Sequence, residues 1–380
     1  LIGGIALLKR FICSIVSVVM GIISVNQLQV GALEVSAKAC IMIEAVTGNV
    51  IYEKNSHDRL PMASTTKIMT TILSLESGDL DTQFTVDSNA IKVEGSSMGL
   101  LEGDIVTKRA LCYGMMLPSG NDSANATAIK LGGSFENFAK MMNDKAIQIG
   151  MNDTLFVTPS GLDEGGHCST AYDMALLTRY ALKNPDFREI CGTYTAQVNF
   201  GNPPYDRWLK NSNKLLNMYD GVIGVKTGFT DDAGRCLVSA CERDGVTLIV
   251  VTLNAPNDWN DHMSLYDYGF SQVSMQSPIN ENFEVNLVGA SKDTLSLERS
   301  AEVLLPNVVG CSADYKTKVY LNEFEYAPIS KGETLGRVEY LLDGEVVSTC
   351  SLVSSEEVLE VKKDVKLSFK EKILKFIYQF

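Results

Sequence analysis

The order of the hydrophobic patterns along this chain is the feature that most limits its fold. Two apolar runs, at residues 39–45 and 49–52, surround Thr47-Gly48-Asn49 and are typical of a β-hairpin. Stretches with helical spacing of apolar residues follow at residues 64–75, 107–116, 121–131, 135–149 and 170–182. Strand-like runs then return at residues 237–240 and 246–253. Strands at both ends of a helical middle predict an α/β (α+β) domain over residues 38–275, with an antiparallel sheet and a helical cluster.

The pattern changes after about residue 276. Short runs of alternating hydrophobicity occur at residues 283–288, 294–297, 318–321, 335–341 and 345–353. Asp343-Gly344, between the last two runs, is a hairpin signal. These runs predict a small all-β domain over residues 276–360, and no residue in it suggests catalysis.

The first 37 residues have the composition of an export signal. Lys9 and Arg10 precede an uncharged apolar run at residues 11–25, and small residues follow in Val30-Gly31-Ala32 and Val35-Ser36-Ala37. The apolar run is shorter than the roughly 20 residues that usually span a membrane. We therefore expect a cleaved signal peptide over residues 1–37 and a secreted, extracytoplasmic protein; an uncleaved anchor is the alternative.

The last twenty residues, 361–380, differ from the rest of the chain. Apolar residues recur there at helical spacing, at Val365, Phe369, Ile373, Phe376 and Phe380. Six lysines stand against two acidic residues, in a chain whose formal net charge is −13. The pattern predicts a basic amphipathic helix that lies on an anionic membrane surface, which would attach the protein to the outer face of the cytoplasmic membrane. A terminal helix packed on the β domain is the alternative.

Composition excludes several classes of function. The net negative charge and the lack of a basic stripe in the body of the chain argue against nucleic acid as a partner. Nine cysteines are scattered without a C-x-x-C pair, and only three histidines are present. We therefore expect no metal site and no cofactor, and we expect several cysteines to be buried free thiols.

The first chemical motif is Ser64-Thr65-Thr66-Lys67. Residues three apart on a helix lie on one face, so the Ser64 hydroxyl and the Lys67 amine can meet. A serine hydroxyl becomes a good nucleophile when a base removes its proton, and lysine is a base only when its pKa is lowered. This pair is a candidate nucleophile and base, although the motif alone is a weak signal.

Two further motifs follow in the chain. Ser119-Gly120-Asn121 places a hydroxyl and an amide where they can face one cavity, and by itself it is equally typical of a turn. Lys226-Thr227-Gly228, followed by Phe229, ends a strand-like run. There the lysine and threonine can bind a carboxylate, while the glycine lets a substrate backbone approach closely. A solvated strand edge is the alternative for this motif.

In this order the three motifs resemble the signature of penicillin-recognising serine enzymes, S-x-x-K, S-D-N and K-T-G. The stretches at residues 60–70, 161–175 and 221–234 are similar to those of the D-Ala-D-Ala carboxypeptidases among the low-molecular-mass penicillin-binding proteins. The resemblance covers residues 39–256 and implies the β-lactamase/transpeptidase-like fold. It also implies peptidoglycan stem peptides as substrate and β-lactam antibiotics as inhibitors.

The resemblance further implies catalytic roles. Lys67 would take the proton of Ser64, which would attack the carbonyl of the penultimate D-Ala. Backbone N–H groups of Ser64 and Phe229 would form the oxyanion hole. Ser119 would pass a proton to the leaving amine.

Substrate binding is implied for the remaining motif residues. Asn121 would orient the peptide, and Lys226 and Thr227 would bind its terminal carboxylate beside Gly228.

Other functions remain open at this point. A class A-like β-lactamase would share the fold, but no segment resembles its usual glutamate loop, and Gly120 stands in the middle motif where aspartate is usual. A transpeptidase and a catalytically silent wall-binding protein on the same scaffold are further alternatives. Residues 95–99 (GSSMG) fit the G-x-S-x-G nucleophile elbow, but the following LLEGD is typical of a loop instead of the required helix.

Overall fold

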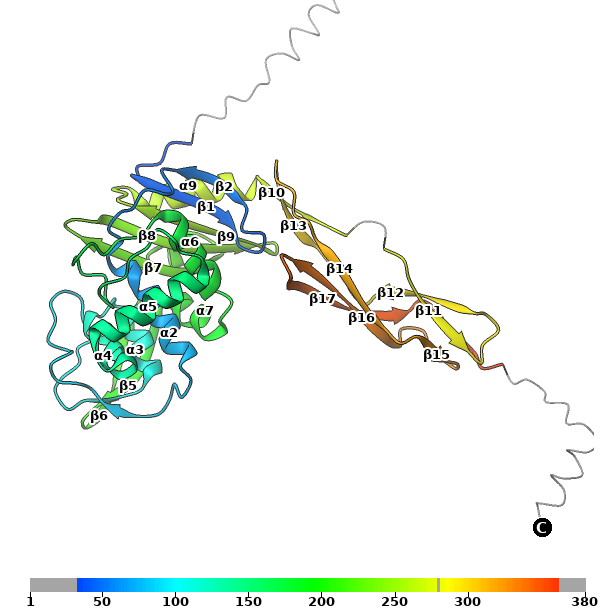
Figure 1. Cartoon of the computed structure of the whole chain (residues 1–380), viewed down its shortest axis with the longest axis horizontal. Helices are drawn as coiled ribbons and strands as arrows, with labels where there is room; N and C mark the ends of the chain where they lie inside the picture. Colours follow the sequence, from blue (N-terminus) through cyan, green and yellow to red (C-terminus); the bar gives the residue numbers. More distant parts are fainter. Residues whose placement is uncertain (1–32, 279–280, 362–380) are drawn as a thin grey trace, which may run out of the picture. The chain divides into compact units, whose positions relative to one another are not determined.

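The computed structural model describes residues 33–278 and 281–361 (Figure 1). A five-stranded sheet forms the centre of the N-terminal part, with every neighbouring pair antiparallel. Its strands, in spatial order, are β2 (Val50–Lys54), β1 (Ala39–Glu44), β9 (Val246–Leu253), β8 (Gly234–Arg243) and β7 (Val222–Thr230). The strand β7 is therefore an edge strand.

Helices cover both faces of this sheet. All six residues of β1 are buried, as are most residues of β8 and β9, which explains their continuous apolar sequences. Figure 1 shows α9 (Asp258–Phe270) on one side of the sheet and α6 (Ala171–Ala181) on the other, with the remaining helices beyond it. The predicted fold class, a mixed α/β domain with an antiparallel sheet and a helical cluster, is confirmed.

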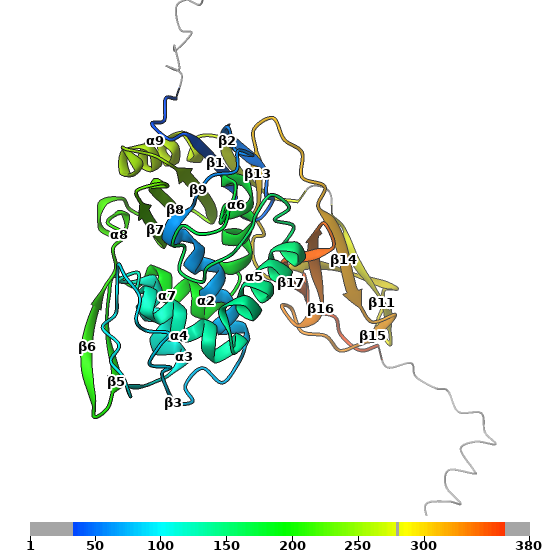
Figure 2. The ribbon, with the colours of Figure 1, turned by 60° about the vertical axis from the view of Figure 1, so that its left-hand side comes forward.

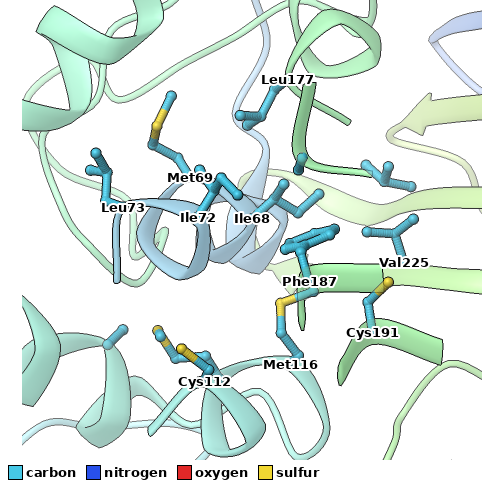
Figure 3. Close-up of a cluster of buried hydrophobic side chains, with 14 of the residues drawn as sticks. Ile68, Met69, Ile72, Leu73, Cys112, Met116, Leu177, Phe187, Cys191 and Val225 are labelled. Atoms are coloured by element: carbon cyan, nitrogen blue, oxygen red, sulfur yellow. The ribbon is translucent and has the colours of Figure 1, made fainter. Parts of the chain in front are cut away.

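The helical cluster is built around one buried helix, α2 (Lys67–Glu76), which continues from the 3-10 turn η1 (Ala63–Thr66). Its apolar face packs against side chains that include Phe187 and Val225 (Figure 3). The surrounding helices are α3 (Lys108–Met116), α4 (Asn121–Gly132), α5 (Phe135–Ile149) and α7 (Pro185–Gly192), and the short α8 (Leu215–Met218) precedes β7. Hydroxyl caps at Thr107, Ser134 and Thr170 accept the first free N–H groups of α3, α5 and α6, so these helices begin where they do.

Short strands complete the first part. The strands β5 (Thr195–Gly201) and β6 (Pro204–Lys210) form a separate hairpin, and β3 (Phe84–Thr85) pairs with β4 (Ile105–Val106). This hairpin and the helices α7 and α9 were not among the predicted elements, although β5 alternates apolar and polar residues as a strand does.

The C-terminal part is all-β, as predicted. A six-stranded sheet has the order β14 (Lys316–Leu321), β16 (Thr334–Leu342), β17 (Glu345–Ser354), β12 (Thr294–Arg299), β11 (Phe283–Val288) and β15 (Phe324–Tyr326). A separate pair joins β10 (Val273–Gln276) to β13 (Leu305–Val308). The sheet has its own core, which includes Leu295, Val338 and Leu352.

Two predicted segments fall largely outside the described residues: the signal peptide over 1–37, of which 33–37 are described, and the terminal helix over 361–380, of which only 361 is described. Within the described part of the chain, no helix is both long and apolar enough to span a bilayer. The cysteines described there are free; six of them are buried, Cys168 is half-buried and Cys311 is exposed.

Candidate active site

The first predicted pair meets at the junction of η1 and α2. Lys67 Nζ lies 2.8 Å from Ser64 Oγ, one turn away as the spacing predicted. Ser64 is half-buried, whereas Lys67 is fully buried. Ala63, just before the serine, has a φ of 48°, a strained conformation that non-glycine residues keep mainly where the surrounding structure imposes it.

Three oxygen atoms surround the Lys67 amine. Besides Ser64 Oγ, they are Asn121 Oδ1 and the Ser160 carbonyl, each 2.7 Å from Nζ. The Asn121 amide has a fixed orientation, because its Nδ2 donates to the Glu94 carbonyl at 2.7 Å. Asn121 Oδ1 and the Ser160 carbonyl are therefore acceptors that cannot donate.

The protonation state of the Lys67 amine decides the direction of its contact with Ser64. A neutral lysine amine has two hydrogens, which Asn121 Oδ1 and the Ser160 carbonyl accept. In that neutral state the amine lone pair is left for the third contact, 2.8 Å from Ser64 Oγ, and the Ser64 hydroxyl donates to it. That is the geometry of a serine whose proton is ready to be removed.

The electrostatics favour the neutral amine. Burial lowers the pKa of Lys67 well below its ordinary value, and the positive charge of Lys226 lowers it further, while Asp122 opposes the change. A lysine in this environment can act as a base near neutral pH.

Ser160 directly precedes the stretch 161–175 that resembles the carboxypeptidases, and no role was predicted for it. Gly161 has a φ of +85°, and a Cβ there would lie 1.9 Å from the Ala63 carbonyl oxygen. Only glycine lets this loop lie so close to η1. His167 Nδ1 accepts from the Val157 N–H at 2.9 Å, so its Nε2 donates to Thr66 Oγ1 at 2.7 Å and ties the loop to η1.

A second loop supports Asn121 from the other side. The buried carboxylate of Asp122 accepts from the backbone N–H groups of Met98, Gly99 and Leu100 and from the Ser97 hydroxyl. Residues 95–99 form an irregular loop with no strand before it and no helix after it, so the nucleophile-elbow alternative is wrong. The sequence analysis predicted no role for Asp122, although this residue directly follows the second motif.

Ser119, predicted to pass a proton to the leaving amine, stands two residues before Asn121 in the second motif. It is buried just before α4, with a φ of 67°. In the described ranges, no hydrogen bond joins its hydroxyl to Ser64 or Lys67.

The third motif lies on the edge strand β7, beside η1. A Cβ on Gly228 would be 3.2 Å from the Ser64 backbone nitrogen, so the backbones of β7 and η1 are in close contact. Lys226 is buried, its Nζ donates to the Thr227 carbonyl at 2.9 Å, and burial lowers its pKa to about 7. Thr227 Oγ1 lies 2.7 Å from Ser212 Oγ, a further site residue that was not predicted, and the Phe229 ring is exposed.

Metal ligands do not gather anywhere in the parts of the chain that the structure describes: no group of three or more His, Cys, Asp or Glu residues could hold an ion there. The described site is therefore formed by a hydroxyl, amines, amides and backbone groups.

Comparisons with known proteins identify the family of this chain. A family model described as D-alanyl-D-alanine carboxypeptidase matches residues 26–257, more than half of the chain. The chain belongs to the D-alanyl-D-alanine carboxypeptidase family. Residues 274–360 match a second model, described as the C-terminal domain of penicillin-binding protein 5.

Relatives of this family are similar over most of the chain. The D-alanyl-D-alanine carboxypeptidase DacF of Bacillus subtilis is 34% identical over 334 residues, covering 85% of this chain and 86% of the relative. The structure of penicillin-binding protein 5 from Haemophilus influenzae is 26% identical, with a TM-score of 0.61, covering 86% of this chain and 98% of that structure. The Streptomyces K15 DD-transpeptidase is 33% identical, with a TM-score of 0.60, covering 63% and 98%. The carboxypeptidase resemblance is thus confirmed, and the chain is a serine peptidase of this family.

Proposed function

We propose that this protein removes the terminal D-Ala from peptidoglycan stem peptides through an acyl-enzyme on Ser64, and that penicillin acylates the same residue. The observation that carries the proposal is the buried Lys67 amine, held 2.8 Å from Ser64 Oγ and with its pKa lowered well below the ordinary value. Family membership supports the substrate.

Acylation follows from the contacts around Lys67. Lys67 Nζ takes the Ser64 proton as Oγ attacks the carbonyl carbon of the penultimate D-Ala. The carbonyl oxygen becomes an oxyanion, which the N–H groups of Ser64 and Phe229 stabilise; the close approach of Gly228 to Ser64 supports this pairing. The bond to the terminal D-Ala then breaks, and its amine receives the proton from Lys67 by way of Ser119.

The edge strand β7 is the proposed binding surface for the peptide. Its outer edge has no partner strand in the five-stranded sheet, so an extended peptide can pair with it. Lys226 and Thr227 bind the terminal carboxylate, and Asn121 orients the peptide amide. A buried amine with one backbone acceptor is suited to an anionic ligand, because the ligand's charge offsets the cost of burial.

Hydrolysis completes the cycle. Water attacks the Ser64 ester, Lys67 accepts a proton from that water, and the shortened peptide leaves with a new carboxylate. A transpeptidase would use an amine in place of water. A class A-like β-lactamase is less well supported, because in the described ranges no carboxylate forms a hydrogen bond with the Lys67 amine.

The test compares Ser64→Ala with Ser97→Ala, which alters the serine of the rejected elbow. With a fluorescent penicillin, we expect stable end-point labelling of the wild type and of Ser97→Ala and none of Ser64→Ala. With a D-Ala-D-Ala peptide, only the proteins that are labelled should release D-Ala. Rapid penicillin turnover would favour the β-lactamase, and product formed mainly with an added amine acceptor would favour the transpeptidase. Labelling that survives in Ser64→Ala would refute the site.

We further propose that the protein is exported and held at the outer face of the cytoplasmic membrane by residues 361–380. The support is the basic amphipathic pattern of that segment. Deleting residues 361–380 should move the protein from the membrane fraction to the soluble fraction, whereas reversing the order of these residues, which keeps charge and periodicity, should not. Retention of the deleted form on membranes would refute the anchor.

A further inference from the structure

The β5–β6 hairpin has two faces of different character. Its inner face carries Val198, Phe200 and Leu209, which are buried in the main core. Arg207 lies on the same face, over the rings of Phe200 and Tyr205, and donates to the Gly99 carbonyl at 2.6 Å. The inner face is therefore fixed to the domain, and Figure 2 shows no helix over the outer side of the hairpin.

The outer face combines an exposed aromatic ring with an ordered polar array. Trp208 is 72% exposed and lies directly opposite Gln197. The next pair on the same face is Asp206 with Asn199. The Asp206 carboxylate accepts from Gln197 Nε2 at 3.0 Å and from Asn199 Nδ2 at 2.7 Å. The two amide oxygens and the free lone pairs of the carboxylate remain available to a ligand.

This pairing of groups suits one class of ligand. A flat indole presents an apolar face, on which the C–H face of a sugar ring can stack, and neighbouring carboxylate and amide groups can bind its hydroxyl and N-acetyl groups. A single exposed hydrophobic residue needs no explanation. Here, however, the ring lies beside a carboxylate that two side-chain amides hold in place, on a face that the core does not need.

The hairpin also leads directly into the proposed peptide site. The chain runs from Trp208 to Ser212, whose hydroxyl contacts Thr227 at 2.7 Å. The strand β6 ends at Lys210, and four residues of chain span at most about 14 Å. The part of a stem peptide between its scissile bond and its sugar has a similar reach, about 10–14 Å for three to four residues. A substrate bound at Thr227 can therefore place its sugar at the outer face of the hairpin.

We propose that Trp208, Asp206, Gln197 and Asn199 form a subsite for the N-acetylated sugar strand that carries the stem peptide. The proposal rests on the proposed function and deepens it, because it makes the glycan-linked peptide a better substrate than the free peptide.

The kinetic test compares a free pentapeptide with a disaccharide-linked pentapeptide. For Trp208→Ala, kcat/KM on the glycan-linked substrate should fall about tenfold, the ratio given by about 1.4 kcal/mol of lost stacking. Its kcat/KM on the free peptide and its rate of penicillin acylation should be unchanged, and Trp208→Phe should recover most of the loss. Tyr326→Ala, which removes a 66% exposed aromatic ring from the β domain, is the matched control. Equal changes on both substrates, or no change on either, would overturn the subsite.

A binding test separates the subsite from the reaction. The chain has two tryptophans, Trp208 and Trp259. Chitotetraose or peptide-free glycan strands should change the fluorescence of Ser64→Ala protein, and the change should vanish with Trp208→Phe but persist with Trp259→Phe. If the wild type releases no D-Ala from either substrate while this signal is present, the proposed function fails and the sugar site stands. A signal that persists in Trp208→Phe overturns the sugar site.

Discussion

Replacing Gly161 by alanine tests whether the Ser160 carbonyl prepares Lys67 for catalysis. The new Cβ would lie 1.9 Å from the Ala63 carbonyl oxygen and 2.8 Å from Thr66 Oγ1. The backbone oxygen cannot move aside as a flexible side chain would, so the loop must shift by at least about 1 Å to restore ordinary contact. The Ser160 carbonyl, now 2.7 Å from Lys67 Nζ, would move beyond hydrogen-bonding distance.

Three effects set the expected losses of stability and of reaction rate in Gly161→Ala. The positive φ costs alanine about 1 kcal/mol, and the lost hydrogen bond to a buried amine costs roughly 1.5–3 kcal/mol. The free energy of unfolding should thus fall by about 2.5–4 kcal/mol. The amine is also released from one of the two acceptors that direct its lone pair to Ser64, and a misplacement of about 1 Å can slow a reaction by about 100-fold.

The control is Gly133→Ala. Gly133 has a φ of +71°, but a Cβ there meets no atom within 4 Å. This variant should lose only about 1 kcal/mol and keep the wild-type acylation rate. Urea unfolding and the second-order rate of labelling by a fluorescent penicillin measure the two effects. If Gly161→Ala acylates as fast as Gly133→Ala, the Ser160 carbonyl does not prepare the base.

Three further outcomes are expected. Burial lowers the pKa of His167 to about 4 and that of His262 to about 3, so both rings are neutral in the folded protein. Since an unfolded imidazole titrates near 6.5, their stability contribution is complete above that pH and falls as the pH drops, by roughly 3 kcal/mol per histidine at pH 4. A His167→Gln or His262→Gln variant should lose less stability than the wild type between pH 7 and 4 in urea unfolding, and an equal loss would contradict this. Lys226, with a pKa of about 7, should be needed in its charged form, so kcat/KM for a D-Ala-D-Ala peptide should decline above pH 7. Lys226→Arg should remove the decline, and an unchanged pH profile would count against carboxylate binding. Asp122→Ala should lower the free energy of unfolding by about 2–4 kcal/mol, because it leaves buried N–H groups without an acceptor; wild-type melting would argue against this role.

Much of the fold could be predicted because its elements carry strong periodic signals. The buried strands β1 and β9 and the helices from α2 to α6 lie close to their expected ranges. The β5–β6 hairpin and α9 were not predicted. The strand β5 does alternate apolar and polar residues, a signal that was overlooked, but the place of the hairpin on the domain depends on contacts distant in sequence, such as that between Arg207 and the Gly99 carbonyl. Local patterns do not contain such contacts.

In the active site, too, the contacts between residues close in sequence could be predicted, and those between distant segments could not. Ser64 and Lys67 share a helical turn, so their meeting follows from spacing alone. The acceptors that orient the amine come from segments far along the chain, including the Ser160 carbonyl, which is a backbone group and leaves no side-chain signature. Gly161 and His167 lie in the stretch 161–175 that resembles the carboxypeptidases, yet their roles follow only from their contacts with η1.

The supporting loops also explain how Lys67 stays a base in a chain with so many carboxylates. A carboxylate in direct contact with the buried amine would form an ion pair and raise its pKa, which would remove the lone pair needed by Ser64. Asp122 follows Asn121 directly and does raise the pKa of Lys67. Its oxygens, however, accept three backbone N–H groups and the Ser97 hydroxyl, while the neutral amide of Asn121 makes the contact with Lys67. The loop over residues 97–100 therefore keeps the acid away from the amine and, through Asp122, holds the start of α4 in place. Motif spacing predicts that Ser64 and Lys67 meet. The loop over residues 97–100 and the loop that carries the Ser160 carbonyl favour the uncharged form of Lys67 at that contact.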